Sequence, residues 1–359
     1  MERERGFNLD AAAFTGLVDL AAEIVGGKAL LCTDDFFAEM QNMLKPGRGV
    51  WIDGKYTDKG KWMDGWESRR KRVPGYDWCI VKLGIPGVIR GVDIDTNNFL
   101  GNHPPYASID ALSADSDASG ETLAKSGEWK EILPKVALKQ GSQNIFAVAS
   151  EERFTHIRLN IYPDGGVARL KVYGDARPDF SKVKADEAID LAAIEHGGIV
   201  VACNDMFFGN KDNMLLPGRA ENMGGGWETR RRRDKGYDWA IVRLGQAGNL
   251  QKMEIDTNFY KGNYPDSAWV EGTYAPGELI DNLTWQNYKW ESVLPKTKLQ
   301  ADHRHYFEKE IGNKGPWTHL RLCIEPDGGI SRFRVHGTLA ASSGEKQVAT
   351  AGSAKAQRP

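Results

Sequence analysis

The stretch THIRLNIYPDGGVARLKVYG, residues 155–174, recurs as THLRLCIEPDGGISRFRVHG at residues 318–337. In the first copy the apolar residues Ile157, Leu159 and Ile161 alternate with polar ones. This is the period of a β-strand that buries one face. A Pro-Asp-Gly-Gly turn follows in both copies, and the strand pattern then resumes. The pattern predicts a β-hairpin in each copy.

The match extends upstream over most of the chain. GGKALLCTDDFFAEMQNMLKPGR at 26–48 aligns with GGIVVACNDMFFGNKDNMLLPGR at 197–219, an offset of 197 − 26 = 171. Trp66 then aligns with Trp227, an offset of 227 − 66 = 161, so the first copy carries a ten-residue insertion between these blocks. A period of about 160–170 residues is too long for a solenoid repeat and indicates a duplicated domain.

The duplication sets the expected domain bounds. We predict a first repeat at 16–175, a linker at 176–186 and a second repeat at 187–338. The remaining residues, 339–359, are rich in Ala, Ser and Gly, and we predict a disordered tail there.

Each repeat is predicted to be mostly strand. DWCIVKLG and DWAIVRLG are expected to be short strands that end at glycine. Helical spacing of apolar residues is confined mainly to the entry segments, 15–27 and 184–198, each ending in Gly-Gly. The pattern predicts an all-β protein of two tandem jelly-roll β-sandwiches, each with a short helix.

Composition narrows the class of protein. The chain has 359 residues, of which 41% are hydrophobic and 27% are charged, which is the balance of a soluble globular protein. Its formal net charge is −2, so we expect no global attraction to nucleic acid or membrane. Its four cysteines have no metal-ligand spacing, which favours reduced thiols and no structural zinc. The first residues lack the apolar core of a signal peptide, and no run approaches a membrane span, so we expect a cytoplasmic protein.

A charged block precedes the strand-like segment in both copies. In the first copy Trp66 and Glu67 are followed by Arg69 and Arg70, and residues 227–231 repeat this order. Such a block is either a solvated loop or a partly desolvated site where guanidinium groups bind a carboxylate. A nucleic-acid patch would also use arginine and aromatic residues, but the near-neutral chain and the nearby glutamates argue against it.

Two further motifs recur. Asp95, Asn97 and Asn102 follow a strand, where they either make local turns or present a carboxylate and amides to a urea-like ligand. His156 and Arg158 lie two apart and therefore leave the same face of a strand, either as packing residues or as an acid/base pair. No P-loop, Rossmann or nucleophile-elbow motif is present, so we expect no cofactor. No cluster has clear metal-ligand spacing, so we name no metal-binding residues.

The quoted blocks, with GKWMDGWESRRKR at 60–72 and DIDTNNFLGN at 93–102, resemble the allantoicase family over roughly residues 20–338. The resemblance implies a hydrolase of allantoin degradation that splits allantoate into ureidoglycolate and urea. It also implies two jelly-roll domains and a homo-oligomer. The second copy departs from the first at Asp64, so the two copies need not be equally active.

Loss of urea requires a proton for the departing nitrogen, a base, and a cation for the carboxylate. The candidate catalytic residues are Glu67, Asp95, His156, Glu228, Asp256 and His319. The candidate substrate-binding residues are Arg69, Arg70, Asn97, Asn102, Arg158, Arg230, Arg231, Asn258, Asn263 and Arg321. The alternative is a tandem jelly-roll module that binds a carbohydrate or another ligand without catalysis, or a regulatory protein descended from an enzyme.

Overall fold

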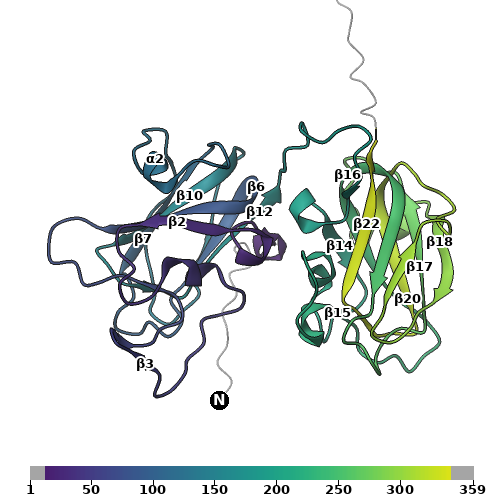
Figure 1. Cartoon of the computed structure of the whole chain (residues 1–359), viewed down its shortest axis with the longest axis horizontal. Helices are drawn as coiled ribbons and strands as arrows, with labels where there is room; N and C mark the ends of the chain where they lie inside the picture. Colours follow the sequence, from purple (N-terminus) through teal and green to yellow (C-terminus); the bar gives the residue numbers. More distant parts are fainter. Residues whose placement is uncertain (1–12, 341–359) are drawn as a thin grey trace, which may run out of the picture.

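The computed structural model describes residues 13–340, which form two β-rich lobes joined by a segment between β12 and β13 (Figure 1). The strands of the first repeat are β1 (Val18–Asp19), β2 (Lys28–Cys32), β3 (Tyr56–Thr57), β4 (Gly60–Lys61), β5 (Trp66–Glu67), β6 (Asp77–Asp95), β7 (Tyr106–Leu112), β8 (Lys130–Ala137), β9 (Ile145–Ala147), β10 (Arg153–Tyr162), β11 (Gly166–Val167) and β12 (Arg169–Ala176). The strands of the second repeat are β13 (Ile189–Asp190), β14 (Ile199–Cys203), β15 (Trp227–Glu228), β16 (Asp238–Asp256), β17 (Ser267–Thr273), β18 (Glu291–Lys298), β19 (Arg304–Phe307), β20 (Trp317–Glu325), β21 (Gly329–Ile330) and β22 (Arg332–Leu339).

Helical structure is sparse. The first repeat has one short α-helix, α2 (Gly120–Ala124). The 3-10 turns are η1 (Ala13–Gly16), η2 (Glu23–Val25), η3 (Met40–Leu44), η4 (Ile194–His196), η5 (Lys211–Leu215), η6 (Met223–Gly225) and η7 (Trp285–Asn287). The predicted tail lies outside the described residues from 341 onward, and Leu339 still belongs to β22.

Each repeat is a sandwich whose two layers share one long strand. In the first repeat β6 pairs with β2 and β10 through its first residues, and with β9 and β12 through its last. The register with β10 shifts where Phe154 faces Gly87 and His156 faces Lys82. Such an irregularity bends the strand and carries it from one layer to the other. The apolar core fills the space between the layers.

The second repeat follows the same scheme. β16 pairs with β14 and β20 at one end and with β19 and β22 at the other. The order β13-β22-β16-β20-β17-β18 therefore repeats the order β1-β12-β6-β10-β7-β8. The predicted mainly-β fold of two repeated sandwiches is confirmed.

Two local predictions were wrong. The DWCIVKLG segment is not a short strand, because β6 runs for 19 residues, through Gly84 and Gly87. The Pro-Asp-Gly-Gly segment does not close a hairpin, because β10 and β12 pair with opposite edges of β6. The chain between them instead makes β11, which pairs with β5.

The entry segments also differ from the predicted helices. Residues 15–27 form β1 between two 3-10 turns, although Leu20 and Val25 are buried as the apolar spacing predicted. The carboxylate of Asp19 accepts hydrogen bonds from the backbone amides of Ala21 and Val172. A side chain that binds backbone amides in this way competes with helix hydrogen bonding. The second repeat has the same arrangement around Asp190.

Candidate active site

The glutamate of the charged block is held rigidly by its backbone. Glu67 lies on β5, next to Trp66, which is fully buried and donates its indole N–H to the carbonyl of Asp34 at 2.8 Å. The backbone of Glu67 pairs with Gly166 of β11 on one side and with Ala38 on the other. Because both edges are paired, the direction of the Glu67 side chain is fixed.

That side chain lines a pocket of about 450 Å³. The side-chain amide of Asn102 donates to Oε1 of Glu67 at 2.6 Å. Burial raises the pKa of Glu67 above its usual range, and the hydrogen bond from Asn102 only partly opposes this. The lining residues are Phe37, Trp51, Lys59, Gly60, Lys61, Met63, Glu67, Asn98, Leu100, Gly101 and Asn102. Glu67 is therefore a carboxyl group that retains its proton more readily than an exposed glutamate.

Part of the lining of this pocket comes from the insertion that distinguishes the first repeat. β3 and β4 pair in a short hairpin, which we call the insertion hairpin (residues 50–61). It contributes Trp51, Lys59 and Lys61 to the pocket. Sequence reasoning missed these residues. The signal that could have found them is the insertion itself, because it adds three lysines and a tryptophan next to the glutamate motif.

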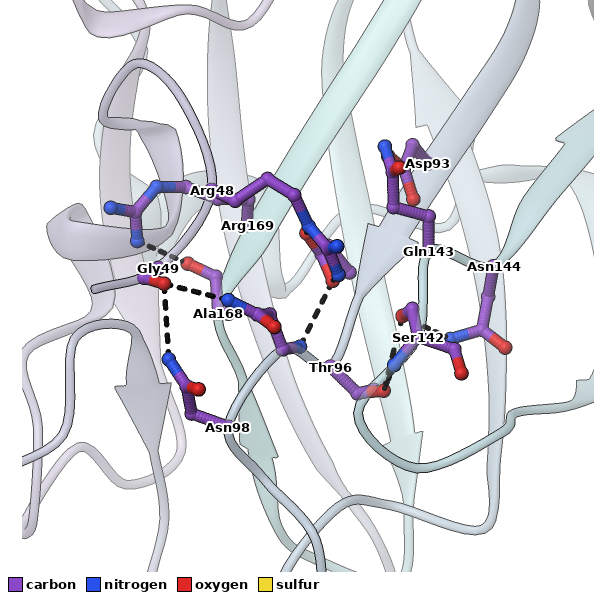
Figure 2. Close-up of polar contacts among 12 residues, drawn as sticks. Arg48, Gly49, Asp93, Thr96, Asn98, Ser142, Gln143, Asn144, Ala168 and Arg169 are labelled. Atoms are coloured by element: carbon purple, nitrogen blue, oxygen red, sulfur yellow. Dashed lines mark hydrogen bonds and ion pairs between the residues drawn. The ribbon is translucent and has the colours of Figure 1, made fainter. Parts of the chain in front are cut away.

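The Asp-Thr-Asn motif anchors the base of the insertion hairpin (Figure 2). The carbonyl of Gly49 accepts hydrogen bonds from the side-chain amides of Asn97 at 2.7 Å and Asn98 at 3.0 Å. Arg48 forms a two-pronged ion pair with Asp95, at 2.7 and 2.9 Å. Asp95 and Asn97 thus hold the segment that leads into the hairpin.

Asp64 provides a second anchor. Its carboxylate accepts a hydrogen bond from the amide of Val50 at 2.9 Å and pairs with Arg169 at 2.7 Å. The side chains of Asp64 and Arg169 are only 8% and 3% exposed. Burial opposes the charge of Asp64, but the Arg169 guanidinium and the Val50 amide hold its pKa below the usual range. The pair is therefore a buried ion pair that fixes the start of the hairpin.

The arginines of the charged block do not line the pocket. Arg69 is bound by Asp34, through its side chain at 2.6 Å and its backbone amide at 2.8 Å, and its guanidinium lies over the Phe36 ring. Arg70 is 69% exposed and lies 3.8 Å from Asp164. Arg69 already has a carboxylate partner, so the structure does not bring it together with Glu67.

His156 and Arg158 lie elsewhere. Ile157 of the same strand joins the core, so both point to the outer face of the sheet. His156 is fully buried, with Nδ1 2.8 Å from the Thr155 hydroxyl. Burial, with Lys82 facing it, lowers the pKa of His156 to about 4. Arg158 pairs with Asp110 at 2.8 Å.

The second repeat keeps several of these contacts. Glu228 accepts a hydrogen bond from Asn263 at 2.5 Å, and Arg230 pairs with Asp205 at 2.7 Å. His319 is buried on the outer face with a pKa lowered to about 4, and Arg321 pairs with Glu271 there. Arg231 is exposed. The Glu-Asn and Arg-Asp pairs are thus common to both repeats.

The anchoring network is weaker in the second repeat. Arg219 lies 3.7 Å from Asp256, and burial raises the pKa of Asp256. The backbone amide of Asn258 donates a hydrogen bond to the carboxylate of Asp256 at 2.8 Å, which makes only a local turn. Gly225 occupies the position of Asp64, so buried Arg332 donates to backbone carbonyls instead of a carboxylate. The second repeat retains the framework of the site without its hairpin or its buried ion pair.

Comparison with known proteins identifies the family. The family model "Allantoicase repeat" matches residues 18–177 and 189–340. The chain belongs to the allantoicase family. It is 51% identical over 322 residues to "Probable allantoicase 1" of Burkholderia mallei, covering 90% of this chain and 94% of that one. It is 48% identical over 322 residues to "Allantoicase" of Dictyostelium discoideum, covering 89% and 87%.

A solved structure of the family agrees with the fold. The allantoicase of Saccharomyces cerevisiae superposes with a TM-score of 0.76 at 34% identity, covering 92% of this chain and 98% of that chain. Among residues 13–340, no helix is both long and apolar enough to span a membrane, and no cluster of three or more potential metal ligands occurs.

Proposed function

We propose that this chain hydrolyses allantoate to ureidoglycolate and urea, the reaction of allantoin degradation that its family name denotes. The observation that carries the proposal is Glu67, whose protonation is favoured by burial and which is held by Asn102 in the pocket of the first repeat. Membership of the family over both repeats supports it.

The chemistry assigns a role to each group. Allantoate carries two ureido groups and a carboxylate on one carbon. When a C–N bond breaks, the departing ureido nitrogen must gain a proton, because urea is a poor leaving group as an anion. The central carbon replaces the lost bond by one of two routes. In the first, water attacks the carbon directly. In the second, the remaining ureido N–H loses its proton so that nitrogen forms a double bond to the carbon, and water then adds to that bond. Both routes need one acid and one base.

Glu67 can serve as both in turn. In its protonated form it donates to the departing nitrogen, and the resulting carboxylate accepts the proton released by water. Asn102 is a positioning residue, because its hydrogen bond to Oε1 leaves Oε2 free for the substrate. Such proton transfer contributes about 10²–10⁴-fold to the rate.

The test is urea release by the purified protein and by Glu67→Gln, which keeps the shape and cannot donate the proton. We expect turnover of Glu67→Gln to fall about 10²–10⁴-fold with little change in KM. Glu228→Gln measures the contribution of the second repeat, and there we expect a loss of less than about 2-fold. Glu131→Gln, an exposed carboxylate on β8, controls for the change of charge. Unchanged turnover in Glu67→Gln would remove this residue from the mechanism.

We also propose that the protein is a cytoplasmic homo-oligomer, as the family resemblance implies. The second repeat exposes Met206, Phe207 and Phe208 next to one another, and exposed apolar patches commonly mark protein interfaces. Sedimentation of the purified protein tests the assembly, and a monomer at micromolar concentration would contradict it.

A further inference from the structure

The pocket around Glu67 needs a cation if it is to bind a carboxylate, and the arginines of the charged block do not supply one. Arg69 is neutralised by Asp34, and it is not among the lining residues. The cations that do line the pocket are Lys59 and Lys61 of the insertion hairpin. Glu67, the acidic residue of the lining, is uncharged when it carries its proton.

Both lysines are positioned without being neutralised. Lys61 donates to the carbonyl of Ile52 at 3.0 Å, and its ammonium lies 4.3 Å from the centre of the Trp51 ring. The ammonium of Lys59 lies 4.9 Å from the centre of the Phe36 ring. Within residues 13–340, neither lysine forms an ion pair with a carboxylate. Each ammonium therefore keeps hydrogen-bonding capacity for an anion.

The hairpin that carries these lysines is anchored at its base by hydrogen bonds and a buried ion pair. Gly49 is held by two asparagine amides, and Val50 by the buried Asp64–Arg169 pair. A buried ion pair is costly to maintain, so its use at the base of an exposed hairpin indicates that the position of the hairpin matters. The second repeat lacks both the insertion and the carboxylate of this anchor, since Gly225 replaces Asp64.

We propose that Lys59 and Lys61 bind the carboxylate of the substrate, and that the insertion hairpin confines the working site to the first repeat. This inference rests on the proposed function, because it assigns the anionic group of that substrate. With the carboxylate held by the lysines, the ureido groups reach Glu67 and Asn102, which line the same pocket. Anion binding and proton transfer are then supplied by two different segments of one repeat.

Steady-state kinetics with allantoate tests the lysines. In Lys61→Met and in the double variant with Lys59→Met, we expect KM to rise about 10-fold or more, because a charge-assisted hydrogen bond is lost. The turnover number should change less than about 3-fold. Lys55→Met is the matched control: this lysine lies on the same hairpin, over the Trp62 ring, and does not line the pocket. A double variant with wild-type KM would overturn the inference.

A binding experiment separates this inference from the proposed function. N-carbamoylglycine has one ureido group and a carboxylate, and its primary amide is neutral with nearly the same shape. By calorimetry, the double variant should bind N-carbamoylglycine about 10-fold more weakly than the wild type does, and its affinity for the amide should be unchanged. Equal weakening for both ligands would mean that the lysines only support the fold of the hairpin, which refutes the inference. Lysine-dependent binding in a protein that releases no urea would refute the proposed function alone.

Discussion

Replacing His156 by glutamine distinguishes a structural histidine from a catalytic one. The ring is fully buried on the outer face of the sheet, and its Nε2 has no hydrogen-bond partner within the described residues. Burial and the facing Lys82 lower its pKa from 6.5 to about 4. Between pH 4 and pH 6.5, the imidazole of His156 is protonated in the unfolded chain but neutral in the folded chain. The contribution of His156 to stability is therefore complete above pH 6.5 and is lost as the pH falls through 4.

The two pKa values set the magnitude. Linkage gives a loss of about 2 kcal/mol in the free energy of unfolding at pH 5 and about 3 kcal/mol at pH 4, relative to pH 8. In the wild type this loss is masked, because burial raises the pKa of Asp19 and of Asp93 to about 6. Those carboxyl groups bind protons in the folded state first, so they stabilise the fold as the pH falls from 6 toward 3.8. The difference between wild type and variant isolates the histidine.

Urea unfolding at pH 8, 5 and 4 measures this difference. As the pH falls from 8 to 4, the free energy of unfolding of His156→Gln should rise by about 2–3 kcal/mol relative to that of the wild type. At pH 8 the variant should retain at least half of the urea-releasing activity. Ile157→Val, on the opposite face of the strand, should cost about 0.5–1.5 kcal/mol equally at every pH. A pH-independent difference for His156→Gln would refute the buried neutral histidine, and a loss of turnover of 100-fold in folded protein would make His156 part of the mechanism.

Two further predictions concern buried ion pairs. Asp64→Asn leaves Arg169 buried without its carboxylate, so the free energy of unfolding in urea should fall by about 3–5 kcal/mol; a loss below about 1 kcal/mol would show that the pair is not needed. Arg321→Lys removes a guanidinium that is 8% exposed and pairs with Glu271, whereas Arg158 is 21% exposed. Thermal unfolding should therefore shift more for Arg321→Lys than for Arg158→Lys, and the reverse order would contradict the role of burial.

The sequence by itself determined the duplication and the β-rich class. The alternation of Ile157, Leu159 and Ile161 depends only on which residues face the core, and their burial follows it. The repeated order of motifs indicated the family, because this order is read from the sequence without any knowledge of tertiary contacts. Local pattern was insufficient where tertiary pairing decides. The turn between β10 and β12 has the residues of a hairpin turn, yet these two strands do not pair with each other. They pair with opposite edges of β6, because both edges of this bent strand are available for pairing.

The composition of the site was decided by tertiary structure. The sequence grouped Glu67, Asn102 and Arg69 as candidate site residues; Glu67 and Asn102 line one pocket, and Arg69 is not among its lining residues. Whether an arginine is free to bind an anion depends on which carboxylate lies beside it, and Asp34, 35 residues away in the chain, is brought there by folding. The raised pKa of Glu67 likewise comes from burial. Burial and charge pairing are properties of contacts between distant segments, so residue types at local spacing could not determine them.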